Sequence, residues 1–210
     1  MKRYLSSSII AAALVCGIVA TPLSAASPET AEPDALEMSV DENLATPEVP
    51  KKAKTYVVTA MDQLRRHLVK NGMTIEPLRD GEVLEITIPC SVLFASGSLE
   101  LKKAGAEFLC PLGMVAREPN RYKMLVTVHT DDTGDDAYAD SISAARANAI
   151  DDYLWQLAGE KETNVIPYGI GKDEPRLPNT SRTNREANRR AEIFIVPDDG
   201  LLEMAGVKRK

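Results

Sequence analysis

Apolar and polar residues alternate along several short stretches of the chain, which predicts β-strands. Residues 73–89 alternate around the turn-forming segment Arg79-Asp80-Gly81-Glu82, and this pattern predicts a β-hairpin. Residues 123–128 form a short apolar run that predicts a buried strand. Two further runs, at 164–168 and 191–196, predict the remaining strands.

Other stretches carry apolar residues three or four positions apart, which is the spacing of a helix with one buried face. Residues 136–157 show it most clearly, and Asp135 and Asp136 suit the start of that helix. Residues 99–117 are predicted as a helix that ends before Pro119, and 184–189 as a single helical turn. The apolar stripe of the helix at 136–157 comprises Ile142, Ala145, Ala149, Tyr153 and Leu157, widened by Ile150 and Leu154.

The order of these elements predicts the fold class. After the hairpin, strands and helices alternate as β-α-β-α-β and a last strand closes the sheet. Such alternation favours an α+β fold with a mixed sheet and helices packed on one face. Residues 51–71 precede this domain and are predicted as a linking helix, with Val57, Met61, Leu64 and Leu68 on one stripe. That stripe either packs on the domain, which we expect, or pairs with a second chain.

The N-terminus has the pattern of a secretory signal. Lys2 and Arg3 precede an apolar stretch at 9–19, and small residues follow at 24–26. We therefore expect residues 1–26 to be a signal peptide and the protein to be exported. An uncleaved membrane anchor is the alternative, because residues 6–26 are long enough to cross a bilayer. A lipoprotein signal at Cys16 is disfavoured, because Val15 stands where such signals need a small residue.

Charge is distributed unevenly along the chain. Residues 27–50 carry seven acidic residues and four prolines but no Lys or Arg, which is typical of a disordered, extended linker. The remaining residues, 51–210, are close to neutral, although the whole chain has a formal net charge of −6. The folded part therefore creates no field that would attract nucleic acid.

Residue types that carry catalysis or bind metals are scarce. His67 and His129 have no metal-ligand spacing around them, and no Ser-His-Asp or Cys-His set is present. No phosphate-binding loop is found, so we expect no cofactor and no enzymatic activity. Cys90 and Cys110 either pair, in an oxidising compartment, or remain two buried thiols.

Polar residues gather after the strand at 123–128, on the following helix and near the C-terminus. Taken singly, each has an ordinary explanation. Asp131 suits a turn in which its side chain accepts the next backbone N–H groups. Arg146 suits a surface cation paired with Asp140 or Asp151. Three arginines near the C-terminus suit a solvated face: Arg185, Arg189 and Arg190.

Taken together, these segments resemble the OmpA-like C-terminal domain of outer-membrane porins, peptidoglycan-associated lipoproteins and flagellar stator proteins. The resemblance covers roughly residues 82–197 and includes several motifs in the same order. These motifs are Val128-His129-Thr130-Asp131-x-x-Gly134, Ser143-x-x-Arg146-Ala147, Arg185-x-x-Asn188-Arg189-Arg190, Val92-Leu93-Phe94 and Gly169-x-Gly171-x-x-x-Pro175. The resemblance implies an OmpA-like β-α-β-α-β-β sandwich over residues 72–198, followed by a C-terminal tail at 199–210.

The resemblance also implies a ligand and a site. The family binds peptidoglycan through the diaminopimelate residue of the stem peptide. By position, Asp131 meets the free ammonium of that residue and Arg146 meets the carboxylate beside it. A carboxylate and a guanidinium at matching separation suit a zwitterion, since arginine binds a carboxylate through two parallel hydrogen bonds. Thr133 and Arg189 fall on positions that line the same pocket, and Thr130 and Arg185 complete the candidate set.

Three positions depart from the family pattern. Ala95 stands where the family often has an acidic residue, Ala139 where it has Asn, and Asn184 where it has Gly. The two alanines remove polar groups that could touch the ligand, which puts affinity in doubt more than the mode of binding.

The resemblance thus implies a non-catalytic anchor between envelope and cell wall, in the periplasm and associated with the outer membrane of a Gram-negative bacterium. Peptidoglycan is the expected partner, with outer-membrane proteins as further partners. Three alternatives stay open at this point. They are a module that no longer binds the cell wall and contacts protein partners, an enzyme acting on wall fragments, and a signal-anchored stator-like protein.

Overall fold

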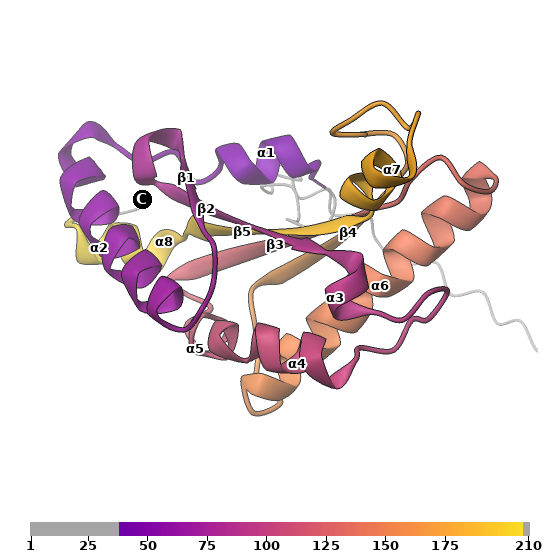
Figure 1. Cartoon of the computed structure of the whole chain (residues 1–210). Helices are drawn as coiled ribbons and strands as arrows, with labels where there is room; N and C mark the ends of the chain where they lie inside the picture. Colours follow the sequence, from indigo (N-terminus) through magenta and orange to yellow (C-terminus); the bar gives the residue numbers. More distant parts are fainter. Residues whose placement is uncertain (1–37, 208–210) are drawn as a thin grey trace, which may run out of the picture. The chain divides into compact units, whose positions relative to one another are not determined.

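Five strands form one mixed sheet in the computed structural model, which describes residues 38–207 (Figure 1). The strand order is β1-β2-β5-β3-β4, in which β3 and β4 are parallel and the other neighbours are antiparallel. The strands are β1 (Glu76–Leu78), β2 (Val83–Pro89), β3 (Tyr122–His129), β4 (Val165–Gly171) and β5 (Arg190–Pro197). The predicted α+β class, the mixed sheet and the N-terminal hairpin are therefore confirmed.

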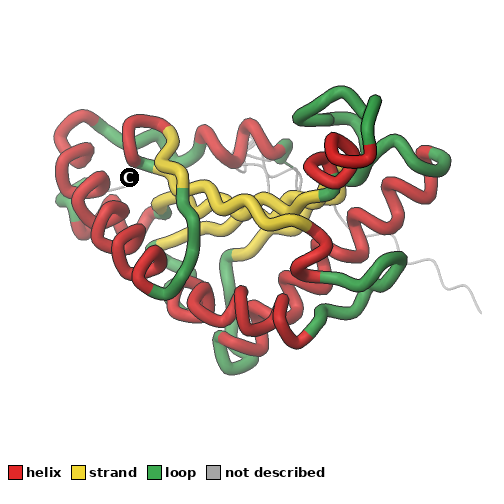
Figure 2. The backbone as a smooth tube through the Cα atoms, in the orientation of Figure 1, coloured by secondary structure: helices red, strands yellow, loops and turns green. Residues whose placement is uncertain are grey.

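Helices connect and flank these strands (Figure 2). The longest are α2 (Lys51–Lys70) and α6 (Asp136–Leu157). Shorter α-helices are α1 (Val40–Ala45), α3 (Cys90–Leu93), α4 (Lys103–Leu109), α5 (Gly113–Ala116), α7 (Arg182–Asn188) and α8 (Asp199–Met204), and 3-10 turns are η1 (Arg79–Gly81) and η2 (Cys110–Leu112). The predicted start of α6 is confirmed, because Asp135 caps the helix by accepting the N–H of Tyr138.

The main core lies between one face of the sheet and helices α2, α4, α5, α6 and α8. Alternate residues of the strands point into it, so that Ile193 on β5 pairs with Ile86 on β2 and Val126 on β3. Ile150 and Leu154 on α6 are fully buried against this face. Each such side chain contributes about 1.5–3 kcal/mol by leaving water, so this layer holds α6 on the sheet.

The stripe on α2 packs on the domain itself. Ala53, Val57, Met61 and Leu68 are completely buried in the main core. The expected packing on the domain is therefore found. The alternative, in which this apolar stripe pairs with a second chain, does not hold, because the domain itself buries the stripe. The helix begins at Lys51, as the boundary of the linking helix predicted.

The opposite face of the sheet is covered in part by α1, which lies across the sheet from α4 and α6 (Figure 1). Val40 and Leu44 pack on a second apolar cluster that includes Leu125 and Phe194. Asn43 is buried and accepts a hydrogen bond of 2.9 Å from the ammonium of Lys123. The prediction of a disordered linker over 27–50 is therefore wrong for residues 38–50, while residues 27–37 lie outside the described residues.

The predicted helix over 99–117 is broken into three pieces. Pro111 has no backbone N–H, so the chain leaves α4, passes through η2 and resumes as α5. Before α4, a bridge between Phe94 and Leu101 closes a loop. Cys90 is buried and Cys110 is exposed, and both are free thiols. The disulfide alternative does not hold, and of the two thiols expected to be buried only Cys90 is.

The segment expected as a tail begins with helix α8. Leu201 and Leu202 are buried in the main core, and the N–H of Gly200 donates to the carbonyl of Asn120 at 2.7 Å. The tail is thus part of the domain up to Val207. The signal expected at 1–26 lies outside the described residues. Within residues 38–207, no helix combines the length and apolar character that a bilayer span requires.

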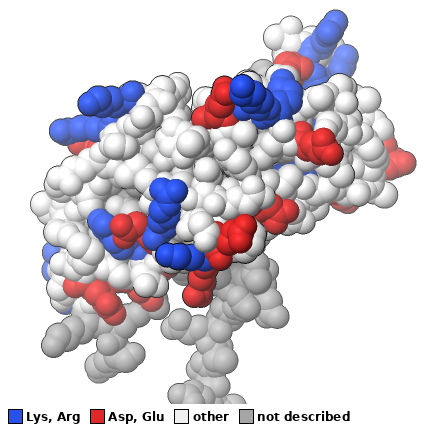
Figure 3. All heavy atoms as spheres, turned by 90° about the horizontal axis from the view of Figure 1, so that it is seen from below, with Lys and Arg blue, Asp and Glu red and all other residues white. Residues whose placement is uncertain are grey.

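Charged side chains of both signs are interspersed on the face of the molecule that Figure 3 shows. Small groups of Lys and Arg lie beside Asp and Glu there, with uncharged surface between them. This mixture agrees with the nearly neutral charge of residues 51–210, and this face has no large basic patch of the kind that nucleic acid needs.

Candidate functional site

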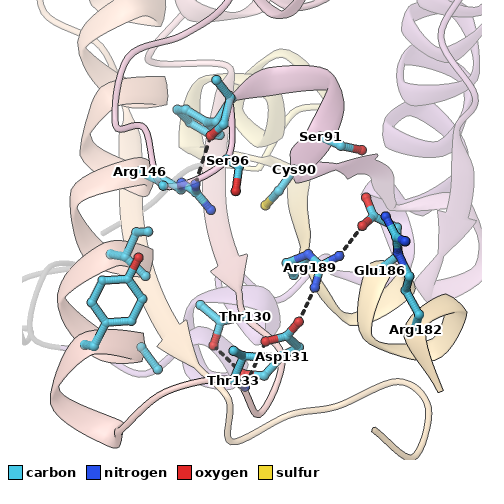
Figure 4. Close-up of a pocket in the computed structure, with 16 residues that line it drawn as sticks. Cys90, Ser91, Ser96, Thr130, Asp131, Thr133, Arg146, Arg182, Glu186 and Arg189 are labelled. Atoms are coloured by element: carbon cyan, nitrogen blue, oxygen red, sulfur yellow. Dashed lines mark hydrogen bonds and ion pairs between the residues drawn. The ribbon is translucent and has the colours of Figure 1, made fainter. Parts of the chain in front are cut away.

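A pocket of about 460 Å³ opens where four segments meet beyond the end of β3 (Figure 4). Its walls are helix α3 with the loop at 94–97 that follows it, the turn that begins at Thr130, the first half of α6, and helix α7 with Arg189. The volume is in the range of pockets that enclose a small-molecule ligand. The pocket brings together Thr130, Asp131, Thr133, Arg146 and Arg189, five of the six residues predicted for the site.

Asp131 supplies a buried carboxylate at one side of the pocket, with only 4% of the residue exposed. Its Oδ1 accepts the N–H of Thr133 at 2.9 Å, and its Oδ2 forms an ion pair with Arg189. Burial raises the pKa of Asp131, but the hydrogen bonds from Thr133 and Arg189 outweigh it and hold this pKa below its ordinary value. Asp131 is therefore both the turn-forming residue that its position suggests and an ionised group in the pocket wall.

Arg146 supplies a buried guanidinium from α6. Its Nε donates to the carbonyl of Ser98 at 3.0 Å, and the guanidinium lies 5.0 Å from the centre of the Phe94 ring. Within residues 38–207, no carboxylate forms an ion pair with Arg146, although the residue is only 7% exposed. The alternative of a surface cation paired with Asp140 or Asp151 is therefore wrong. The loop around Phe94 fixes a cation that retains unused donors toward the pocket.

Close packing of α6 on β4 places Arg146 at the pocket. A Cβ on Gly169 would lie 2.4 Å from the backbone nitrogen of Ala144, so only glycine allows the helix to approach this strand so closely. The hydroxyl of Ser143 accepts the N–H of Gly171 at 3.0 Å. The N–H of Thr130 donates to the carbonyl of Gly171 at 2.7 Å, which ties the turn before Asp131 to the end of β4.

Arg189, which ends α7, lies between two carboxylates (Figure 4). Its Nη1 pairs with Asp131 and its Nη2 pairs with Glu186. Arg185 lies elsewhere: it donates from Nη1 to the carbonyl of Asn179 at 2.7 Å and does not line the pocket. The structure therefore does not bring Arg185 to the pocket, because the helical turn directs it to the preceding loop.

Asn188, the central residue of the same motif, is completely buried and holds that loop. Its Nδ2 donates to the carbonyl of Leu177, and its Oδ1 accepts the N–H of Leu177. A second hydrogen bond from Nδ2 reaches the side chain of Asn179. The motif near the C-terminus thus combines one pocket residue, Arg189, with residues that shape the loop around it.

Several pocket residues were missed in the sequence. Glu186, Arg182, Ser91 and Tyr138 all line the cavity. The spacing of Glu186 and Arg189, three apart on a predicted helical turn, could have indicated their ion pair. The other three carry no signal in the sequence, because only the fold brings α3, α6 and α7 to one cavity.

His129 lies outside the pocket and has a structural environment. It is 1% exposed, and its Nε2 lies 3.4 Å from a carboxylate oxygen of Glu192 and 3.2 Å from the hydroxyl of Thr127. Burial raises the pKa of Glu192, but the bonds from His129 and Arg190 prevail and bring this pKa to about 2. His129 therefore belongs to a buried polar network on the sheet.

The arrangement is suited to binding a small ligand that carries both charges. One wall offers the carboxylate of Asp131 and another the guanidinium of Arg146. Ala95 and Ala139 also line the pocket and offer no polar side-chain atoms. Within residues 38–207, no group of three or more His, Cys, Asp or Glu side chains lies close enough to hold a metal ion.

Comparison with known sequences places the pocket in a family context. The sequence model of the OmpA family matches residues 93–189, which include every pocket residue from Phe94 to Arg189. The chain is 29% identical to the lipoprotein YiaD of Escherichia coli over 126 residues, which are 60% of this chain and 57% of YiaD. It is 28% identical to the outer-membrane lipoprotein YfiB of Pseudomonas aeruginosa, over 56% of this chain and 69% of YfiB.

Solved structures show the same fold. A MotB-like protein from Desulfovibrio vulgaris superposes with a TM-score of 0.58 and 26% identity, over 69% of this chain and 98% of that protein. The cell wall anchor of the type VI secretion system from Pseudomonas aeruginosa superposes with a TM-score of 0.52 and 25% identity, over 72% of this chain and all of that chain. The sequence match and the shared sheet thus make residues 93–189 similar to the domain of the OmpA family.

Proposed function

We propose that this protein binds peptidoglycan without catalysis, through the diaminopimelate residue of the stem peptide. The observation that carries the proposal is the buried guanidinium of Arg146, which no carboxylate of the described residues neutralises. A buried charge is costly unless it is paired, so a site of this kind favours an anionic ligand. A carboxylate from outside the protein would complete it.

Asp131 narrows the ligand to one that also carries a cation. Its carboxylate stays ionised, because the groups around it lower its pKa. The free end of diaminopimelate carries an ammonium and a carboxylate on one carbon, so it offers a partner to Asp131 and another to Arg146. Losing either partner would leave a charge desolvated and unpaired, at a cost of roughly 2–5 kcal/mol.

The relatives support the wall as the source of this ligand. One structural neighbour is named as the cell wall anchor of a secretion system, and two sequence relatives are named as lipoproteins, one of them of the outer membrane. We propose by analogy that the chain works in the periplasm, associated with the outer membrane, and anchors the envelope to the wall. The export signal expected at 1–26 fits this location. Outer-membrane proteins are the expected further partners of the protein.

A protein–protein interaction module is the second candidate. Ala95 and Ala139 favour it, because both line the pocket where polar side chains could contact a wall peptide. Such a module would keep the fold but bind diaminopimelate weakly.

Co-sedimentation with purified diaminopimelate-type peptidoglycan tests the proposal. The wild-type protein is expected to sediment with the wall, and Asp131→Asn and Arg146→Gln are expected to remain in the supernatant. Glu162→Gln is the matched control, because it removes one charge from an exposed residue that does not line the pocket. Retention of both pocket variants on the wall would contradict the site, and a wild-type protein that stays in solution would favour the second candidate.

A further inference from the structure

Arg189 forms an ion pair with Asp131, the carboxylate to which the proposed function assigns the ammonium of the ligand. In the described structure its Nη1 pairs with Asp131, which is buried, while its own side chain is 35% exposed (Figure 4). The ammonium of a ligand must therefore share Asp131 with a cation that is already present. How much of Asp131 remains accessible depends on the orientation of the Arg189 guanidinium.

An arginine can bind one carboxylate through two parallel N–H groups, which is its strongest arrangement. Arg189 does not bind Asp131 in this way, because its Nη2 is engaged by Glu186. Asp131 Oδ1 accepts the N–H of Thr133 instead of a second guanidinium N–H. Since a carboxylate offers about four acceptor positions, Asp131 retains room for a further donor.

Glu186 is placed to hold this arrangement. It lies one turn before Arg189 on α7, and its side chain is 45% exposed. Hydrogen bonds from Arg189 first, and from Ser91 second, lower the pKa of Glu186, so that it stays charged at neutral pH. Ser91 belongs to α3, so Glu186 is supported from a second element of the pocket wall.

We infer that Glu186 is a positioning residue, which keeps the guanidinium of Arg189 from closing over Asp131 and so leaves Asp131 open to a cationic group of the ligand. The inference rests on the proposed function and adds to it a residue that touches no ligand itself. Without Glu186, both ends of Arg189 are free to turn toward Asp131, and the ammonium then competes with a two-bonded guanidinium.

A double-mutant cycle measured by isothermal titration calorimetry tests the inference. The titrant is the tripeptide L-Ala-γ-D-Glu-diaminopimelate, added to the wild type, Glu186→Gln, Arg189→Gln and the double variant. Glu186→Gln is expected to weaken binding about five-fold, the scale of a partly exposed charge pair. In the Arg189→Gln background the same change is expected to have no measurable effect, because no guanidinium remains to be positioned. Glu162→Gln controls for net charge, and melting temperatures control for folding.

The possible results distinguish a failure of the inference from a failure of the proposed function. A Glu186→Gln variant that binds as tightly as the wild type contradicts the inference and leaves the proposed function standing. An equal loss in both Arg189 backgrounds also contradicts it, because Glu186 would then act on the ligand directly. A wild-type protein that gives no heat at millimolar peptide contradicts the proposed function, and the inference falls with it.

Discussion

At the scale of single residues, Arg146 is distinguished by the combination of burial and unused donors. Its Nε is fixed by the carbonyl of Ser98 and its guanidinium carbon lies over the ring of Phe94, so the guanidinium is oriented before any ligand arrives. An oriented group loses less entropy on binding than a free one. The placement of Arg146 explains why a guanidinium suits this position better than another cation would.

Arg146→Lys tests that explanation. Lysine keeps the charge but lacks the planar fork that binds both oxygens of a carboxylate. We expect the Kd for a diaminopimelate tripeptide to rise about ten-fold or more, because a hydrogen bond to a charged group contributes about 1.5–3 kcal/mol. Calorimetric titration measures this change. Binding that is undiminished in Arg146→Lys would mean that charge alone is recognised.

The pKa of Asp131 predicts how binding depends on pH. Because this pKa is lowered in the folded protein, Asp131 stays ionised below the ordinary pKa of a carboxyl group. Affinity for the tripeptide is therefore expected to remain constant between pH 7 and pH 5, and to fall only in more acidic solution as Asp131 is protonated. Titrations at pH 7, 6 and 5 check this expectation. A loss of affinity with a midpoint near pH 6 would assign recognition to another group.

At the scale of elements, the contact between α6 and β4 carries Arg146 to the pocket. Gly169→Ala would place a Cβ against the backbone of Ala144, where neither element can yield without moving the helix. We expect it to lower the free energy of unfolding by roughly 1–3 kcal/mol, the range of overpacked core substitutions, and to weaken peptide binding.

Gly159→Ala is the comparison for that experiment. Gly159 has a φ of +80° but open space around it, so this variant is expected to show backbone strain without steric overlap and to leave peptide binding unchanged. Thermal melts and titrations of the two variants separate the effects. If Gly169→Ala retained both stability and affinity, the close approach would not matter to the site.

Helix α6 also carries Asp151, whose ionisation destabilises the folded protein. Burial first, and the neighbouring Asp152 second, raise the pKa of Asp151 to about 6. A raised carboxyl pKa means that the unfolded chain ionises first as pH rises, so stability is lost between about pH 4 and pH 6.

Asp151→Asn should remove that loss. Because Asp151 is partly exposed, solvent screening reduces the effect, and we expect a gain of ~1 kcal/mol at pH 7. The gain should disappear at pH 4, where the wild-type carboxyl group is protonated. Melting temperatures at the two pH values measure it, and an equal gain at both would exclude ionisation as the cause.

At the scale of the whole molecule, the sheet and its main helices could be predicted from local patterns. The boundaries of α6 could be predicted because a capping Asp and a long apolar stripe mark them. The helix over 99–117 was mispredicted because Pro111 interrupts it within an otherwise helical pattern. Helix α1 was not predicted, because its segment is acidic and has only two apolar residues, Val40 and Leu44, that pack on the sheet.

The site could be predicted as far as its motifs extend in sequence. Asp131, Thr133, Arg146 and Arg189 lie together in the pocket, as the family resemblance implies. Arg185 could not be assigned, because the direction of a side chain on a single helical turn depends on where that turn packs. The role of Glu186 could not be predicted either, because it depends on the ion pair between Arg189 and Asp131, which the sequence does not show.

The central claim is that Arg146 and Asp131 together recognise a zwitterion. Titrating the wild-type protein with two stem tripeptides, one ending in diaminopimelate and one in lysine, tests it most directly, because lysine keeps the ammonium and lacks the carboxylate beside it. The account predicts that the diaminopimelate peptide binds at least about ten-fold more tightly, the value of one charge-assisted bond to Arg146. Equal affinity for the two peptides would contradict it.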